Sequence, residues 1–429
     1  MKKHRSKINL FSPSPEGCKL IFFSSGCWQT GVKKEDQNFN TIIKIIGFVF
    51  IMVLYFQASI AQNKLTTTSK AQLSSWATFN FDKKITSQFG SRLIPAINFD
   101  KTFESKLKID AEISLNTTGY LTFTDWEKTD QGESFKAYRL WARISGKKWE
   151  LRAGLQKINF GSAIILRPLM WFDQMDPRDP LQLTNGVYGL LGRYFFKNNA
   201  NLWLWTLYGN ENLKGWELIG SEIHDPEYGG RFQFPVLKGE LATSYHFRKA
   251  NSTQTMIDWG HNTHMVMPEH RFGIDGKWDM KIGLWIESTY THNKSVFGLP
   301  DAVNLVKNRV YNTIGIDYTF GIGNGLHVSG EQLFMTFAGP GFNPTETISF
   351  SSLVLNYPLS LLDQISVVLF YNWDNKDWYR FINFQRNYDN WSFYLMAFWN
   401  PEQFQLFNIN DDNNLMIGKG LQLMAVYNF

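Results

Sequence analysis

The sequence contains little cysteine, little proline and few long apolar runs, and each shortage excludes a class of structure. Its 429 residues include 14 prolines and two cysteines, Cys18 and Cys27. Two cysteines close to one end exclude a disulfide-rich secreted scaffold. Each crossing of a helical membrane protein requires about 20 mostly apolar residues, and a single segment meets that requirement. The mean hydropathy of −0.26 agrees with this exclusion.

That single segment is TIIKIIGFVFIMVLYFQASIAQ, residues 41–62. Its apolar core runs for about 12 residues after Lys44 and ends in a small-residue sequence, which is typical of a secretory signal peptide. We therefore predict a signal peptide over 41–61 with cleavage after Ala61; an uncleaved anchor is the alternative. Residues 1–40, which hold both cysteines, are then an extension that the mature protein lacks. No cysteine follows the cleavage point to carry a lipid.

The charge balance argues against a nucleic-acid partner. The formal net charge is +5 and the isoelectric point about 8.9. Residues 1–61 contain eight basic and three acidic residues, and removing them from the totals of 43 and 38 leaves 35 of each. The mature protein is therefore predicted to be neutral, without the basic footprint of a nucleic-acid-binding protein.

A two-residue period dominates the mature chain from Ser69 onward. In KLKIDAEISLN, residues 106–116, the odd-numbered positions are apolar and the even-numbered positions are polar. Residues 149–156 and 421–429 repeat this alternation. Such a period predicts strands with one polar and one apolar face.

Turn signals divide the mature chain into about 18 strands, with 16 as the alternative, of roughly 9–13 residues, the length of a tilted strand that crosses a bilayer. We predict an all-β fold, a closed antiparallel transmembrane β-barrel over 62–429, because hydrocarbon offers no partner to a free sheet edge. A secreted β protein with a large aromatic core is the alternative. Short connections are predicted at 146–148, 197–199, 237–239, 278–280, 321–325 and 388–390, alternating with long ones at 119–133, 161–188, 209–227, 248–268, 293–307 and 400–418.

Aromatic residues cluster near the predicted strand ends, and the chain finishes with GLQLMAVYNF at Phe429. In these features residues 69–429 resemble Gram-negative outer-membrane porins. The sequence RAGLQ at 152–156, followed by Gly161 and a long acidic and aromatic loop, is similar to 18-stranded porin and alginate-export barrels. The resemblance implies location in the bacterial outer membrane and recognition of the C-terminal strand by the barrel-assembly machinery.

The stretch LRPLMWFDQMDPRDPLQLTNG, residues 166–186, interrupts the regular pattern. Its prolines at 168, 177 and 180 lack the N–H donor that a strand ladder needs. Bulky apolar residues alternate with charges, so the loop is unsuited to open water. We expect loop 161–188 to fold back into the barrel, pack its apolar side chains on the wall and constrict the pore.

The charges of this loop suggest a transverse field across the pore. We predict that Asp173, Asp176 and Asp179 face Arg139, Arg143 and Arg152 on the wall, where a low dielectric strengthens their effect. A plain extracellular loop whose aspartates and arginines pair with each other is the alternative. The predicted constriction set is Arg167, Asp173, Asp176, Arg178 and Asp179, and the predicted pore-lining set is Lys106, Lys108, Asp110, Glu112, Arg139, Arg143, Glu150 and Arg152.

Two groups of residues contain side chains that could serve an enzyme or a metal site. His261, His264, Glu269 and His270 lie in DWGHNTHMVMPEHRFG, but their spacing matches no closed zinc pattern. Period two places Ser288, Tyr290 and His292 on one strand face, yet no GxSxG nucleophile motif accompanies them. We predict no catalytic residue, no metal and no cofactor.

The leading functional prediction is a passive channel for small hydrophilic solutes. One alternative is an export barrel for an acidic polysaccharide, which requires a net basic lumen. A scaffold barrel within a surface or secretion complex is another. The expected partners are outer-membrane lipid and the solutes, and a homo-oligomer is left open.

Overall fold

The computed structural model describes residues 65–429 apart from 83, 177, 254–265, 299–304 and 402–415. The predicted extension 1–40 and signal peptide 41–61 lie outside this part of the chain and stay predictions. No helix among the described residues is long and apolar enough to cross a membrane.

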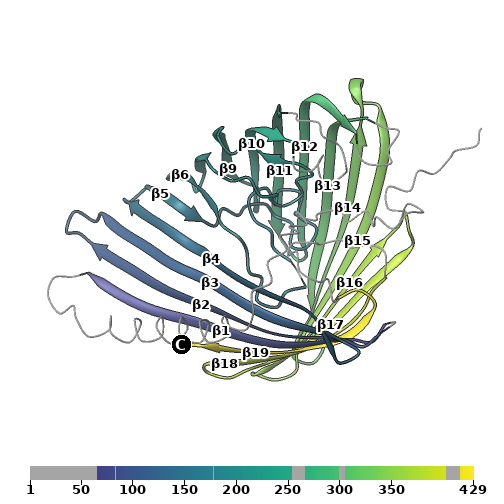
Figure 1. Cartoon of the computed structure of the whole chain (residues 1–429). Helices are drawn as coiled ribbons and strands as arrows, with labels where there is room; N and C mark the ends of the chain where they lie inside the picture. The colour runs from purple at the N-terminus through teal and green to yellow at the C-terminus, as the bar shows by residue number, and fades with distance from the viewer. Residues whose placement is uncertain (1–64, 83, 177, 254–265, 299–304, 402–415) are drawn as a thin grey trace, which may run out of the picture.

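The described residues form one antiparallel sheet (Figure 1). Its first seven strands are β1 (Thr66–Asn80), β2 (Thr86–Thr102), β3 (Lys108–Thr124), β4 (Glu127–Ser145), β5 (Trp149–Gln156), β6 (Val187–Phe195) and β7 (Asn201–Leu207). The next seven are β8 (Gly220–Ser221), β9 (Glu227–Val236), β10 (Gly239–Asn251), β11 (Val266–Asp279), β12 (Gly283–Gly298), β13 (Leu305–Phe320) and β14 (Leu326–Ala338). A short 3-10 turn, η1 (Pro340–Phe342), precedes β15 (Pro344–Pro358), β16 (Asp363–Asn372), β17 (Asp377–Asn387), β18 (Trp391–Trp399) and β19 (Lys419–Asn428).

The sheet closes on itself because β1 pairs with β19 as well as with β2. The two-residue strand β8 pairs only with the end of β10, while β7 pairs with β9 and continues the ring. The ring therefore has 18 strands, as the period and turn signals predict. The last backbone N–H, that of Phe429, donates to the carbonyl of Ala71 at 2.8 Å, so the C-terminus is part of the closure.

Side chains alternate between the two faces of the wall, as the two-residue period predicts. On β3, Ile109 and Ile113 are 41% and 46% exposed, while the residues that follow them, Asp110 and Ser114, are buried. The exposed face is thus the outside of the barrel and it is apolar. Other large apolar side chains on this outer face are Leu140, Leu190, Leu204, Phe272, Ile274, Ile286, Ile314, Ile316, Leu353, Ile382, Leu395 and Leu423.

The connections follow the predicted rhythm only in part. The short turns agree with expectation, but the predicted long connection 119–133 is wrong. There β3 and β4 continue as a hairpin that turns at Asp125 and Trp126, whose φ angles of 51° and 72° suit a two-residue turn between twisted strands. The connections 339–343 and 373–376 are also short, although they lie at the same end of the barrel as the long ones.

Two long connections at that end turn into the barrel. The first inner loop, residues 157–186, joins β5 to β6, and the second inner loop, residues 208–226, joins β7 to β9 and contains β8. Both contribute to apolar clusters with side chains of the wall. The loops are the teal coil inside the strands in Figure 1.

Candidate functional site

Two carboxylates on the far wall hold the first inner loop. Glu331 on β14 accepts hydrogen bonds from the backbone N–H groups of Ile164, Ile165 and Leu166 at 2.6, 3.1 and 2.6 Å. Glu287 on β12 accepts from the backbone of Ala163 at 2.9 Å and of Leu169. These N–H groups belong to a loop outside the strand ladder, and the two acids provide the acceptors that buried N–H groups need.

The apolar side chains of the first inner loop pack inside the barrel. Phe160, Trp171 and Phe172 form a cluster with Leu191 of β6 and Trp205 of β7. The ring centroids of Phe160 and Trp205 are 5.5 Å apart, and those of Phe172 and Trp205 are 5.4 Å apart. This packing explains why a segment rich in bulky residues interrupts the strand pattern: its apolar side chains are covered by the inner wall.

The acids and arginines of this loop pair mainly with each other. Arg167 and Asp173 form an ion pair at 3.0 Å and are 4% and 1% exposed, so they lie in the packed base of the loop rather than in open lumen. Arg178 and Asp176 pair at 2.7 Å. Asp179 accepts backbone hydrogen bonds within the loop and lies within electrostatic range of Arg92 on β2. Arg92, which the sequence prediction did not include, is a wall cation whose charge opposes the rise in the pKa of Asp179.

The three predicted wall arginines have other partners. Arg139 reaches the end of the loop through the carbonyl of Thr184 at 2.9 Å. Arg143 forms an ion pair with Asp110 at 2.8 Å, across from β4 to β3. The guanidinium of Arg152 lies 4.7 Å from the ring centre of Trp141. The structure therefore does not pair these three arginines directly with the loop aspartates, contrary to the prediction from the sequence.

The remaining predicted lining residues divide between the wall and a turn. Glu150 bridges Arg143 at 3.2 Å and Arg193 at 3.0 Å, so a charged row crosses β3 to β6. Glu112 accepts from the indole of Trp141 at 3.2 Å, and Lys108 pairs with Asp100. Lys106 is a correction, because it lies in the turn between β2 and β3 with a φ of 63° and outside any strand.

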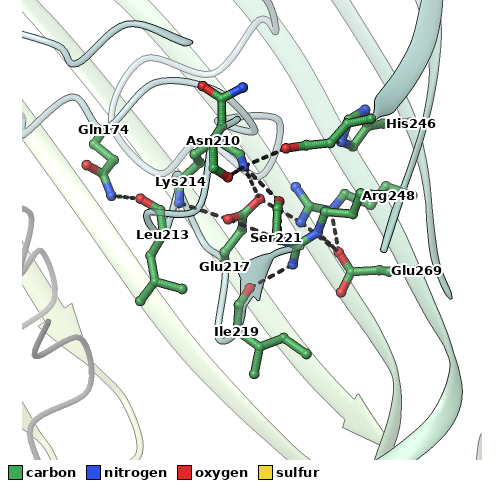
Figure 2. Close-up of polar contacts among 12 residues, drawn as sticks. Gln174, Asn210, Leu213, Lys214, Glu217, Ile219, Ser221, His246, Arg248 and Glu269 are labelled. Atoms are coloured by element: carbon green, nitrogen blue, oxygen red, sulfur yellow. Dashed lines mark hydrogen bonds and ion pairs between the residues drawn. The ribbon is translucent and has the colours of Figure 1, made fainter. Parts of the chain in front are cut away.

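A buried ion network joins the second inner loop to the wall (Figure 2). Glu269 on β11 accepts from Arg248, Arg271 and Arg309, each at 2.7 Å, and is fully buried. Glu217 of the loop pairs with Arg271 at 2.9 Å and with Arg248 at 3.3 Å. Buried charges persist only when paired, so this network fixes the loop to strands β10 and β11.

Lys214 extends the network to the next strand. Its ammonium group pairs with Glu227 of β9 at 3.0 Å and donates to Ser221 at 2.9 Å. Glu227 also contacts His246 at 3.0 Å. The sequence signal for this network was present in the charged residues at alternate positions of β9 to β13, whose partners become evident only once the strands are in register.

The two inner loops also contact each other. The indole N–H of Trp216 donates to the carbonyl of Arg167 at 2.7 Å, and the amide of Gln174 donates to the carbonyl of Leu213. Gly215 has a φ of 50°, and a Cβ there would lie 1.5 Å from the carbonyl oxygen of Met170. Only glycine allows this approach, so the loops form one body inside the barrel.

The residues considered for catalysis or metal binding are separated. Glu269 points into the barrel, whereas His270 is outside and bonds to Tyr245 at 2.9 Å, so they cannot share a metal ion. His261 and His264 lie outside the described residues. Ser288, Tyr290 and His292 do share one face, the outer face of β12. Ser288 donates to Asn312 at 2.7 Å, while the other two contact Asn308.

Asp179 gives a pH-dependent prediction. Burial raises the pKa of its carboxyl above the ordinary 3.8, against the opposing effects of the Leu181 and Leu183 N–H groups and of Arg92. The folded protein therefore binds this proton more tightly than the unfolded chain does. The resulting contribution to folding stability is complete below the ordinary pKa and is lost as the pH rises through the raised pKa. Asp179→Asn keeps an oxygen acceptor but has no carboxyl to ionise. Its midpoint of thermal unfolding in detergent should therefore exceed that of the wild type at pH 7. The two midpoints should be equal near pH 3.8, the ordinary pKa.

Circular dichroism of both proteins across that pH range measures this difference. Asp179→Ala is the control, because it removes the acceptor for both N–H groups and should unfold at a lower temperature than either. A midpoint for Asp179→Asn below that of the wild type at pH 7 would show that the charge itself stabilises the loop.

The wall and its inner loops define a closed antiparallel β-barrel of 18 strands with an apolar outside and a charged inside. No protein-family model and no curated protein matches the chain. Among solved structures, the chain is similar to OccAB4 of Acinetobacter baumannii, with 10% identity, a TM-score of 0.49, and coverage of 86% of this chain and 98% of the other. It is also similar to OmpT, an outer membrane protein of Vibrio cholerae in trimer form, at 10% identity and a TM-score of 0.48, covering 86% and 100%. OmpF of Salmonella typhi, in complex with daunomycin, gives 11% identity, a TM-score of 0.45, and coverage of 86% and 99%.

Proposed function

We propose that the protein is a porin-like channel of the bacterial outer membrane, through which small hydrophilic solutes diffuse passively. The observation that carries this proposal is the combination of a closed ring of strands with an apolar outer face and a charged inner face. A closed ring leaves no free sheet edge among its 18 strands, which lipid requires. Proteins dissolved in water also rarely expose so large a continuous apolar surface. The predicted signal peptide and the C-terminal aromatic residue agree with export to that membrane.

The first inner loop is proposed to narrow this channel. It starts at β5, bonds to β12 and β14, and places Arg178 at 6.0 Å from the ring centre of Phe381 on β17. A segment that reaches from one wall to the opposite wall reduces the free cross-section. The charged residues of the part of the loop that crosses the lumen are Asp176, Arg178 and Asp179. The buried pair of Asp173 and Arg167 stabilises the base of the loop.

The wall formed by β2 to β6, from which the loop leaves, has an excess of cations. Arg92, Arg139, Arg143, Arg152 and Arg193 face inward from β2 to β6, against the acids Asp110, Glu112 and Glu150. This excess favours small anionic solutes. It is also what export of an acidic polysaccharide requires, so that export role is the second candidate. The two inner loops favour the first, because they fill space that a polymer needs.

Conductance in planar bilayers tests the channel, and a charge variant tests the loop. The wild type should give steady ohmic current, whereas silence would favour a scaffold role. In Asp176→Asn/Asp179→Asn, Arg178 loses its counter-charge, so the reversal potential in a KCl gradient should shift toward anions. Asp279→Asn, at an exposed turn on the other end of the barrel, is the matched control. Unchanged selectivity in the double variant would remove these aspartates from the constriction.

A further inference from the structure

The outer face of β12 to β15 carries a row of hydrogen-bonded polar side chains. Ser288 on β12 donates to Asn312 on β13 at 2.7 Å, and Ser351 on β15 donates to Gln332 on β14. The chain neighbours of these residues are buried inside the barrel, among them Glu331 beside Gln332. Alternation therefore places all four side chains on the outside. We call Ser288, Asn312, Gln332 and Ser351 the outer polar row.

On β13 this row lies within the lipid-facing band, and on β15 it reaches the exposed aromatic end of the wall, where the indole N–H of Trp373 donates to Ser351 at 2.7 Å. On β13 the outward positions between Tyr318 and Asn312 are Ile316 and Ile314, which are 46% and 59% exposed. For a strand tilted by about 40°, Asn312 is then about 15 Å from the level of Tyr318 along the barrel axis. The apolar band of such barrels is about 25 Å tall. The carboxamides of Asn312 and Gln332 therefore lie at the depth of the lipid tails.

The chemistry of the row differs from that of other polar side chains on the outer face. Ser75 and Ser91 bond to each other at 2.8 Å across β1 and β2, and this pair has a single hydroxyl hydrogen left over, whereas each carboxamide has two amide hydrogens to donate. The bonds from Ser288 and Ser351 use only the oxygens of the two carboxamides. Gln332 donates one bond to the carbonyl of Leu333 at 3.3 Å, while its second amide hydrogen and both of those of Asn312 have no acceptor among the described residues. An N–H group facing hydrocarbon is costly, so it calls for a partner within the membrane.

We propose that a second copy of this chain covers the outer polar row, forming a two-fold dimer in the membrane. This inference rests on the membrane location proposed above. A carboxamide is both donor and acceptor, so the row is complementary to itself, as a two-fold interface demands. Gly330, two positions from Gln332, has no side chain and open space around it, so the exposed ring of Phe334 of the partner could approach the wall closely there.

Disulfide crosslinking tests the interface directly. Both native cysteines precede the predicted cleavage point, so Asn312→Cys would give the mature chain a single thiol. Oxidation of outer membranes containing this variant should give a covalent dimer. Ile113→Cys, equally outward-facing on β3, is the matched control, and the wild type checks for residual native thiols. Equal crosslinking at both positions, or none at Asn312→Cys together with a monomeric wild type, would overturn the dimer.

A second pair of variants keeps the proposal testable if the thiol cannot react. Asn312→Leu/Gln332→Leu should convert the dimer to a monomer in native mass spectrometry from detergent, whereas Ser75→Ala/Ser91→Ala should leave the dimer intact. A dimer that persists in the leucine variant contradicts this interface. Membrane retention and conductance are measured on the same samples. An intact dimer without current counts against the channel alone, and a monomeric wild type with normal current counts against the dimer alone.

Discussion

Replacing Glu331 with alanine should raise the single-channel conductance by at least about twofold, because the first inner loop loses the carboxylate that anchors it to the far wall. Glu331 accepts from three consecutive backbone N–H groups of the loop and from the indole of Trp285 at 2.9 Å. Each buried donor left without an acceptor costs about 1–3 kcal/mol. The docked position of the loop should therefore become unfavourable, and the loop should leave the lumen for part of the time.

Planar-bilayer recordings with matched variants isolate this effect. Glu331→Gln retains one carbonyl oxygen and should give an intermediate conductance with more current noise. Glu133→Gln, on the exposed part of the β3–β4 hairpin, changes the same charge far from the loop and should leave the conductance at the wild-type value. Wild-type conductance in Glu331→Ala would mean that the apolar packing of Trp171 and Phe172 holds the loop without the carboxylate.

The largest loss of stability is expected for Glu269→Gln. Glu269 is the common acceptor for three buried guanidinium groups, and after its neutralisation the charge of Glu217 is the nearest that remains to Arg248 and Arg271. Breaking a buried pair by removing one charge costs about 3–5 kcal/mol. Urea unfolding in detergent, followed by tryptophan fluorescence, should show a decrease of this size in the free energy of unfolding.

Two further variants separate the wall from the loop. Asp279→Asn breaks an exposed pair with Lys277, and exposed pairs contribute at most about 1 kcal/mol. Glu217→Gln should destabilise less than Glu269→Gln, because Glu217 belongs to the second inner loop, which can detach while the wall stays closed. A loss below about 1 kcal/mol in Glu269→Gln would show that the arginines find other acceptors.

The sequence by itself determined the wall of this protein. In residues 106–116 the alternation of apolar and polar side chains assigns each to one face, and the structure confirms that assignment from Lys108 onward. The alternation is local and repeats along the chain, so it also indicated about 18 strands and most of the short turns. It failed at 119–133, where polar residues suggested a loop although the strands continue beyond the apolar band.

Only the tertiary structure decided which charges meet. The loop backbone at Ala163 and Ile164 finds its acceptors 124 and 167 residues further along the chain, on the opposite wall. The period shows that a side chain points inward, but the partner is set by strand register and by the curvature of the closed ring. For that reason Asp173 pairs within its own loop with Arg167, and Arg143 pairs within the wall with Asp110, whereas the sequence alone predicted loop aspartates facing wall arginines.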